Sequence, residues 1–276
     1  MKVGIVGIGN MGRHYVSKFK ILGYDAVLVD LNQKLLAKYD SSFKKYTDID
    51  EALKKEKLDY LFVATAPTSH IPIAKKALEK EINVMVEKPP SINPKELEEA
   101  IDLAEKKGVV LGVSEIELRS NSVRNFENNT NIHEVEAYRL NLGRGYINPF
   151  YDLAWHDLYI FQYLFDRVKI NKVIDKGDIF DIYGETDKNE FFLQVAWSQK
   201  NLKRKWILKT KNGDIVFDFV NDKIIYPSGE EKEKDGKDKL ETMIKEFIEN
   251  PTFESSYRAL EILKEFDKFN IKEKVA

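Results

Sequence analysis

The stretch that decides the fold reads Lys2-Val3-Gly4-Ile5-Val6-Gly7-Ile8-Gly9-Asn10-Met11-Gly12. A short apolar run that leads directly into G-x-G-x-x-G is typical of a strand that turns into a phosphate-binding helix, so it predicts a dinucleotide site. Gly7 permits the tight turn, Gly9 lets the backbone approach a pyrophosphate, and Gly12 lets the new helix pack closely on its strand. The start of that helix offers backbone N–H groups and a positive dipole end to the anion.

The glycine motif alone is shared by many folds, so the prediction of a dinucleotide site also depends on the segment that follows. Val27-Leu28-Val29-Asp30 predicts a second strand that ends in an acid, roughly 20 residues after the motif, where a carboxylate can accept hydrogen bonds from ribose hydroxyls. A carboxylate there repels a 2′-phosphate, and no Arg or Lys follows directly in Leu31-Asn32-Gln33. We therefore predict NAD in preference to NADP. The alternative is an ordinary glycine turn in a strand–helix unit.

Length and composition narrow the class of protein. A chain of 276 residues with 43% hydrophobic residues suits two globular domains, and no apolar run approaches the length of a bilayer span. The absence of cysteine excludes disulfides, thiolate metal sites and a cysteine nucleophile, and we expect no metal. A formal net charge of −2 argues against a polyanion-binding surface. We expect no nucleic-acid or membrane partner, and a cytoplasmic protein because no targeting segment precedes the first strand.

Strands and helices alternate over the first 113 residues, which predicts a parallel, doubly wound sheet of the Rossmann type. After the first strand, a helix from Gly12 ends at Gly23. The further elements that we expect are a strand at 26–30, helices at 31–39 and 50–57, a strand at 60–64, a helix at 71–80, a strand at 83–87, a helix at 94–107 and a strand at 109–113.

The pattern changes beyond residue 113, where apolar residues alternate with period two. Segments 133–141, 191–198, 204–210 and 214–219 predict a second α/β domain with an open, mostly antiparallel sheet. Both faces of 191–198 carry apolar residues, so the second face is covered either by a partner subunit or by a helix of the same chain. Two amphipathic helices, at 239–249 and 256–269, close the chain. We predict a cofactor-binding domain at 1–116 and a substrate-binding and oligomerisation domain at 117–276.

Ligands of open α/β sheets bind beyond the carboxyl ends of the strands, so the residues that follow the strands are the candidates for chemistry. Thr65-Ala66-Pro67-Thr68-Ser69-His70 follows one strand, and Glu87-Lys88-Pro89-Pro90 follows the next. A lysine between an acid and a rigid Pro-Pro pair is held in position. The alternative is an ordinary solvated lysine.

A third candidate segment lies in the second half, at Tyr151-Asp152-Leu153-Ala154-Trp155-His156-Asp157. Its pattern predicts one helix that carries Asp152 and His156 on a shared face, at i and i+4. A carboxylate there can orient the imidazole and stabilise its protonated form, which gives the base that oxidation of an alcohol requires. The alternative is a core histidine preceded by a helix-capping aspartate.

Four motifs together resemble the glucose–fructose oxidoreductase, inositol dehydrogenase and MocA-type (Gfo/Idh/MocA) family of NAD(P)-dependent oxidoreductases, and the resemblance runs nearly end to end. They are the glycine motif Gly7–Gly12, the segment Thr65–His70, the triplet Glu87-Lys88-Pro89 and the pair Asp152 and His156. The Asp152-Leu153-Ala154-Trp155-His156-Asp157 run is similar to the D-L-A-x-H-D run of the UDP-N-acetylglucosamine 3-dehydrogenase branch. Glu115-Ile116-Glu117 is similar to the H-I-E segment of that branch, with Glu115 where a histidine is expected.

The resemblance implies hydride transfer between a nicotinamide and a secondary hydroxyl or ketone of a sugar, nucleotide-sugar or cyclitol. Lys88, Asp152 and His156 would be catalytic: Lys88 would bind the reacting oxygen, His156 would exchange its proton, and Asp152 would orient His156 or contact the sugar. The same three residues, with Glu117 and Arg139, are the candidates for substrate contact. The cofactor would contact Gly7, Gly9, Asn10, Met11, Gly12, Asp30, Leu31, Thr65, Ala66, Pro67, His70, Glu87 and Lys88.

The resemblance also implies a homodimer or homotetramer formed through the exposed face of the second sheet. Two other functions are open. A non-catalytic NAD-binding sensor is one, although a sensor has no need for a proton-transfer pair such as Asp152 and His156. A methyl transferase that uses S-adenosylmethionine is the other, which Gly12 and the lysine after the strand disfavour.

Overall fold

The computed structural model describes residues 1–127, 131–143, 145, 147–197, 199–232, 235–269 and 271. The chain divides into two compact units, Met1–Ser114 with Leu240–Leu263 and Glu115–Lys239 with Lys264–Ala276. The predicted boundary at residue 116 lies close to the end of the first segment. Leu240–Leu263 differs from the prediction, because it packs with the first unit although we assigned it to the second domain.

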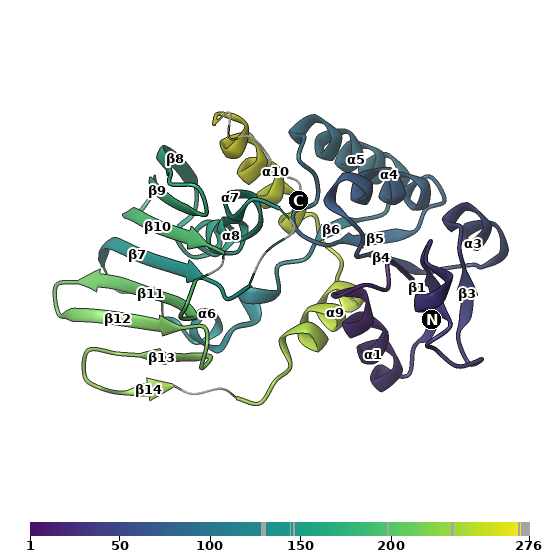
Figure 1. The fold of residues 1–276 in the computed structure, drawn as a ribbon, viewed down its shortest axis with the longest axis horizontal. Helices are drawn as coiled ribbons and strands as arrows, with labels where there is room; N and C mark the ends of the chain where they lie inside the picture. The colour runs from purple at the N-terminus through teal and green to yellow at the C-terminus, as the bar shows by residue number, and fades with distance from the viewer. Residues whose placement is uncertain are drawn as a thin grey trace. The chain divides into compact units, whose positions relative to one another are not determined.

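The first unit contains a sheet whose six described strands all pair in parallel, in the order β3-β2-β1-β4-β5-β6 (Figure 1). The predicted doubly wound sheet is thereby confirmed. Its strands are β1 (Lys2–Val6), β2 (Asp25–Val29), β3 (Lys44–Tyr46), β4 (Tyr60–Val63), β5 (Asn83–Val86) and β6 (Leu111–Val113). Its helices are α1 (Gly12–Leu22), α2 (Gln33–Leu36), α3 (Ile49–Lys55), α4 (Pro67–Leu78), α5 (Pro94–Lys107), α9 (Lys239–Glu249) and most of α10 (Glu254–Asp267).

Aromatic side chains explain why α9 joins this unit. The ring of Phe62 on β4 lies 4.9 Å from that of Phe19 on α1 and 6.0 Å from that of Phe247 on α9. Helices α1 and α9 therefore cover one face of the sheet, while α4 and α5 lie on the other (Figure 1). The sequence predicted the amphipathic pattern of α9, but it did not predict which of the two sheets α9 packs against.

The second unit contains a sheet with eight described strands in the order β14-β13-β12-β11-β7-β10-β9-β8. Strands β7 and β10 pair in parallel and the other neighbours pair antiparallel, which confirms an open, mostly antiparallel sheet. The strands are β7 (Ile132–Leu140), β8 (Val168–Asp175), β9 (Ile179–Thr186), β10 (Glu190–Ala196), β11 (Lys203–Thr210), β12 (Gly213–Asp218), β13 (Lys223–Ile225) and β14 (Glu231–Lys232). The helical segments are η1 (Ile116–Arg119), α6 (Asn121–Arg124), α7 (Pro149–Asp152) and α8 (Ala154–Phe165).

Two predicted helices need correction. Helix α4 begins at Pro67 and not at 71, because a proline is well suited to the first helical position, so His70 lies in the helix. The helix predicted through Asp152 and His156 is interrupted at Leu153. The N–H of His156 donates to Leu153 O at 3.2 Å, an i to i−3 bond that tightens the chain at the break. Leu153 itself keeps right-handed helical torsions, with φ of −89° and ψ of −43°, so the shared face of Asp152 and His156 stays a prediction.

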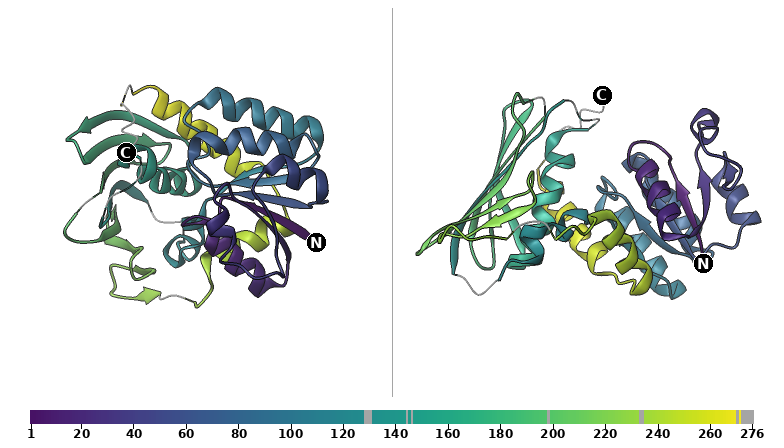
Figure 2. Two further views of the ribbon diagram at one scale, coloured as in Figure 1. Left: turned by 45° about the vertical axis from the view of Figure 1, so that its right-hand side comes forward. Right: turned by 90° about the horizontal axis from the view of Figure 1, so that it is seen from below.

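Helices α7 and α8 pack on one face of the second sheet (Figure 2). Phe161 of α8 stacks on Phe191 of β10 at 4.5 Å and on Trp206 of β11 at 4.2 Å, and all three side chains are buried. A helix of the same chain thus covers the Phe191 face. On the other face, half-buried Phe192 lies between the rings of Tyr138 and Tyr183. Association of two copies through this face stays a prediction, and Ser198 lies outside the described residues.

A buried ionic network lies beneath α8. Both carboxylate oxygens of Asp157 accept hydrogen bonds: Arg139 Nε donates to one at 2.6 Å, and Trp206 Nε1 donates to the other at 2.7 Å. A further guanidinium nitrogen of Arg139 lies 3.7 Å from Glu117 Oε1. Glu117 Oε2 accepts hydrogen bonds from Ser120 Oγ at 2.6 Å and from Lys239 Nζ at 3.1 Å.

The network keeps its groups charged despite their burial. Burial alone would raise the pKa of Glu117, but the charges of Arg139 and Lys239 and the hydrogen bond from Ser120 outweigh it and lower the pKa to about 2. Burial lowers the pKa of Arg139, and the charges of Asp157 and Glu117 outweigh that effect and raise it.

None of the described helices is both long enough and apolar enough to cross a bilayer.

We predict that Asp157→Asn lowers the free energy of unfolding by about 3–5 kcal/mol, because it leaves the guanidinium of Arg139 buried without its main counter-charge. The double variant Arg139→Met/Asp157→Asn should lose less than the single variant, since it removes both charges. Urea denaturation of both variants and of Arg139→Met measures the coupling. Additive losses from the two single substitutions would contradict this account of the pair.

We also predict that Glu117→Gln costs about 2 kcal/mol near neutral pH and progressively less in acid. A carboxyl whose pKa is lowered in the folded state stabilises above its unfolded pKa, and this stabilisation is lost as the pH falls toward about 2. Denaturant unfolding of both proteins from pH 7 to pH 3 tests the convergence. The control is Glu134→Gln, at an exposed position of β7. A difference that stays constant over this range would refute the assignment.

Candidate active site

The glycine-rich loop between β1 and α1 has the geometry that the sequence predicts. Gly7 has φ of +86°, and its N–H donates to Val29 O at 2.8 Å. A Cβ at Gly12 would lie 1.8 Å from Gly7 O, so only glycine allows α1 to begin so close to β1. A Cβ at Gly9 would meet nothing within 4 Å, which leaves the backbone there open to a ligand.

The start of α1 fits the phosphate groups of a dinucleotide. Its N-cap, Met11, makes no side-chain capping bond, and the first turn contains no acidic residue. The backbone N–H groups of this turn and the positive end of the helix dipole therefore favour an anion. Contact of Gly7, Gly9, Gly12, Asn10 and Met11 with a pyrophosphate stays a prediction.

Asp30 directly follows β2, beside this loop. Its carboxylate accepts hydrogen bonds from the N–H of Ile8 at 2.6 Å and from the N–H of Asn32 at 2.7 Å. A carboxylate has about four lone-pair positions, so acceptor capacity is left for ribose hydroxyls. The next side chain, Leu31, is 92% exposed. The carboxylate of Asp30 is thus held against the glycine loop. The residue that follows it, Leu31, is uncharged and offers no cation to a 2′-phosphate.

The segment after β4 is braced by His70. Its ring nitrogens lie 2.9 Å from Thr65 O and 3.0 Å from Pro89 O, so the ring joins the segment after β4 to the segment after β5. The side chain is only 1% exposed, and burial lowers its pKa although the two carbonyl contacts raise it. Ser69 Oγ adds a hydrogen bond to Thr65 Oγ1 at 2.7 Å. His70 holds these segments together, and its contact with a cofactor stays a prediction, as do those of Thr65, Ala66 and Pro67.

Lys88 is the second residue after the end of β5. The preceding Glu87 continues the strand ladder, because its N–H donates to Val63 O at 2.8 Å. The carboxylate of Glu87 accepts hydrogen bonds from the Tyr15 hydroxyl at 2.6 Å and from the N–H of Lys88 at 3.3 Å. Burial, and then the charge of Glu87, raise the pKa of Tyr15 far above its ordinary value. The backbone that carries half-buried Lys88 is therefore tied to α1, the helix of the glycine motif.

In the second unit, Asp152 and His156 are half-buried in a segment whose other side chains are mostly buried. The Nδ1 atom of His156 lies 3.0 Å from the hydroxyl oxygen of Tyr159. That oxygen accepts a hydrogen bond from the N–H of Glu117 at 3.0 Å. Burial, and then the charge of Glu117, raise the pKa of Tyr159 far above its ordinary value. Sequence analysis missed Tyr159, although its spacing of three residues from His156 places the two one turn apart.

The predicted substrate contacts Glu117 and Arg139 belong to the buried network beneath α8, where their charged groups bind each other, Asp157 and Lys239. Their contact with a substrate stays a prediction. Asp157 and Trp206 are partners that the sequence did not reveal. In the described part of the chain, no group of three or more His, Cys, Asp or Glu side chains is placed to hold a metal ion.

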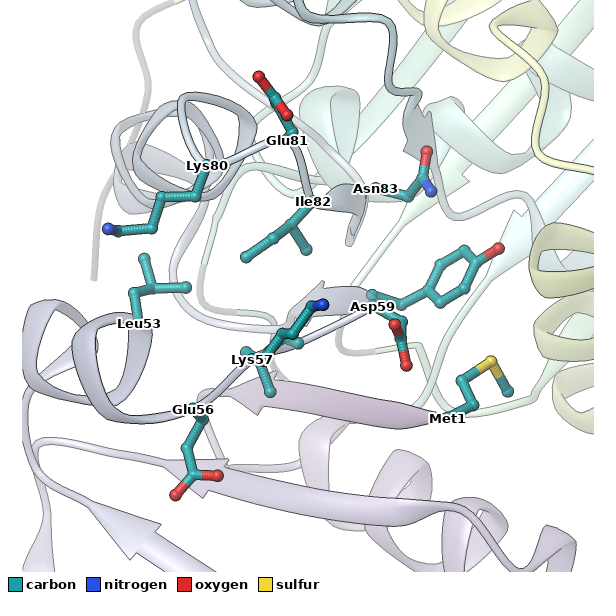
Figure 3. A pocket seen from close by; sticks show the side chains of 11 residues that line it. Met1, Leu53, Glu56, Lys57, Asp59, Lys80, Glu81, Ile82 and Asn83 are labelled. Carbon is teal, nitrogen blue, oxygen red and sulfur yellow. The ribbon is translucent and has the colours of Figure 1, made fainter.

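A separate pocket of about 810 Å³ lies at the opposite edge of the first sheet (Figure 3). Met1, Tyr60 and Asn83, which line it, stand at the starts of β1, β4 and β5. The carboxylate of Glu56, also in its lining, accepts hydrogen bonds from Lys2 and Tyr46. The glycine loop and the segment of Lys88 follow the other ends of β1 and β5, so this pocket lies away from the predicted cofactor contacts.

Comparison with known proteins agrees with this geometry. Residues 1–115 match the family described as "Oxidoreductase family, NAD-binding Rossmann fold" (GFO_IDH_MocA). UDP-N-acetylglucosamine 3-dehydrogenase of Acidithiobacillus ferrooxidans is 23% identical over 118 residues, which are 42% of this chain and 37% of that protein. Glycosyl hydrolase family 109 protein 4 of Phocaeicola vulgatus is 29% identical over 118 residues, 38% of this chain and 23% of that protein.

These matches span less than two thirds of the length of either relative. A solved structure of the Acidithiobacillus ferrooxidans dehydrogenase has a TM-score of 0.80 at 19% identity, and the similarity covers 96% of this chain and 94% of that one. The fold is therefore shared over almost the whole chain, beyond the segment in which the sequences match. Residues 1–115 are therefore similar in sequence to the Gfo/Idh/MocA family of oxidoreductases with an NAD-binding Rossmann fold.

Proposed function

We propose that the protein is an NAD-dependent dehydrogenase that acts on a secondary hydroxyl or ketone of a sugar, a nucleotide-sugar such as UDP-N-acetylglucosamine, or a cyclitol. The observation that carries the proposal is the placement of Lys88 at the same edge of the sheet as the glycine loop. Strands β1, β4 and β5 are parallel neighbours, so the segments that follow them lie side by side. Through Glu87 and Tyr15, the backbone of Lys88 is held to the helix that would bind the cofactor.

Three side chains of this chain would carry the reaction. Lys88 would donate a hydrogen bond to the reacting oxygen and stabilise negative charge on it. His156 would exchange the proton of that oxygen, and Asp152 would orient the imidazole or bind the sugar. The nicotinamide, when bound, supplies or accepts the hydride, so the protein has to orient the substrate and manage one proton.

Sugars are the proposed substrate class because the two relatives described above have names that refer to carbohydrate chemistry, one a nucleotide-sugar dehydrogenase and the other a glycosyl hydrolase. Of these two activities, the run from Asp152 to Asp157 favours the dehydrogenase, because it is similar to a run in that branch of the family. Each of these relatives matches within a limited segment, so the substrate of the whole protein is a proposal.

We predict that NADH binds at least about tenfold more tightly than NADPH, a difference of about 1.4 kcal/mol, because the carboxylate of Asp30 repels a 2′-phosphate. Leu31→Arg should raise the affinity for NADPH, since this exposed position follows the acid and can present a cation to the phosphate. Leu31→Gln is the uncharged control. Fluorescence titration of both cofactors measures the affinities, and equal or tighter NADPH binding by the natural protein would overturn the preference.

We predict that Lys88→Ala and His156→Ala each lower kcat about 10²-fold or more, because each removes a group that acts on the reacting oxygen, while the Kd for NAD stays within about threefold. Lys95→Ala on α5 and His133→Ala on β7, both at exposed positions, are the controls. The assay follows NAD reduction with UDP-N-acetylglucosamine, free hexoses and inositols, and a glycoside is included to test for hydrolysis.

Three outcomes decide between the functions. If both variants keep full activity, the assignment of Lys88 and His156 is wrong. If the natural protein binds NAD tightly but reduces it with no member of the panel, the non-catalytic sensor becomes the better hypothesis. Release of the aglycone without net formation of NADH would favour a hydrolase in place of a dehydrogenase.

A further inference from the structure

The hydroxyl of Tyr159 makes two described contacts, and they determine where its proton points. The N–H of Glu117 donates to the hydroxyl oxygen at 3.0 Å, and Nδ1 of His156 lies 3.0 Å from the same oxygen. Tyr159 is completely buried on α8, one turn beyond His156. All three residues belong to the second unit.

A tyrosine hydroxyl has one proton to donate and two lone pairs that accept. The amide of Glu117 can only donate, so it uses one of the lone pairs. Of the two contacts, Nδ1 of His156 is then the one that can accept the hydroxyl proton. A neutral imidazole carries its proton on one nitrogen alone, so an Nδ1 atom that accepts requires the proton to be on Nε2.

We propose that Tyr159 is a positioning residue for His156, which fixes the neutral imidazole as the Nε2–H tautomer by donating its hydroxyl proton to Nδ1. The opposite arrangement, in which Nδ1–H donates to the tyrosine, would deprive the hydroxyl proton of the acceptor that the structure provides. Because Tyr159 has a strongly raised pKa, the hydroxyl keeps its proton, and this proton needs an acceptor.

The support for Tyr159 extends one step further into the unit. The amide that anchors its hydroxyl belongs to Glu117, whose carboxylate is held by Arg139, Lys239 and Ser120. The short helical segment η1 is therefore fixed by ion pairs on one side and presents its N–H to Tyr159 on the other. The buried network beneath α8 therefore contributes to the orientation of His156, because it holds Glu117, whose N–H positions the hydroxyl of Tyr159.

The tautomer matters for the reaction. In the proposed state, the Nε2 atom of neutral His156 is a hydrogen-bond donor, suited to a carbonyl or alkoxide oxygen. To accept the proton of a hydroxyl at Nε2, the ring would first release its Nε2 proton to solvent and take up a proton from solvent at Nδ1, and the Tyr159 hydroxyl would turn from donor to acceptor. This role for Tyr159 rests on the proposed function, since it acts through His156.

Nitrogen-15 NMR of histidine-labelled protein tests the tautomer without any substrate. The chain has four histidines, and comparison with His156→Asn identifies the signals of His156. At pH about 8.5, two units above the ordinary pKa of histidine, we expect a protonated Nε2 and an unprotonated Nδ1. A protonated Nδ1 would overturn the proposal, whether or not the protein proves to be a dehydrogenase.

Kinetics of Tyr159→Phe provide the second test. We expect kcat to fall about tenfold, a part of the 10²–10⁴-fold that general acid–base catalysis supplies, with KM within about twofold and a displaced Nδ1 signal. Tyr163→Phe, which removes a hydroxyl from an exposed position of the same helix, should change none of these quantities.

The two proposals can fail separately. An unchanged kcat and an unmoved Nδ1 signal in Tyr159→Phe would refute the positioning role. If His156→Ala keeps full activity, the catalytic assignment of His156 fails, while the NMR spectrum still decides the tautomer.

Discussion

The parallel pairing of β2, β1, β4 and β5 is the constraint on which the cofactor half of the site depends. Because these strands run in one direction, the glycine loop, Asp30, the segment from Thr65 and Lys88 all follow the same edge of the sheet. Contacts between the segments then fix what the pairing brings together. Asp30 binds the glycine loop through Ile8 N–H, and His70 binds the segment after β4 to the one after β5.

A different principle organises the second unit, where charge is buried and compensated. Asp157 and His156 are adjacent on α8, but Asp157 is completely buried and His156 is half-buried. Arg139 and Trp206, on β7 and β11, bind the carboxylate of Asp157 and so fix how α8 lies on the sheet. A buried ion pair need not add much net stability, but removal of one partner is costly, so the pair specifies this orientation strongly.

Sequence predicted best what local chemistry determines. Helix α5 has the predicted bounds because Asn93 caps its start, Pro94 occupies the first helical position, and Gly108 ends it with φ of +67°. Local patterns of this kind did not predict the break at Leu153, strands β8 and β9, or the partners of Asp157. Trp206 lies 49 residues beyond Asp157 in the chain, and no local pattern shows which strand brings it there. The roles of Lys88, Asp152 and His156 came from a motif, and motifs do not reveal a positioning group such as Tyr159.

The four histidines, all within the described residues, illustrate why burial alone does not identify a proton-transfer group. His14 and His133 are exposed. Both ring nitrogens of His70 face carbonyl oxygens, and a neutral ring can donate to only one of them, so this side chain serves the fold and is closed to solvent. His156 combines a half-buried ring with a fixed partner for Nδ1. Proton exchange needs one nitrogen held in place and a ring that a substrate can reach, and among the four histidines His156 has the surroundings that suit it.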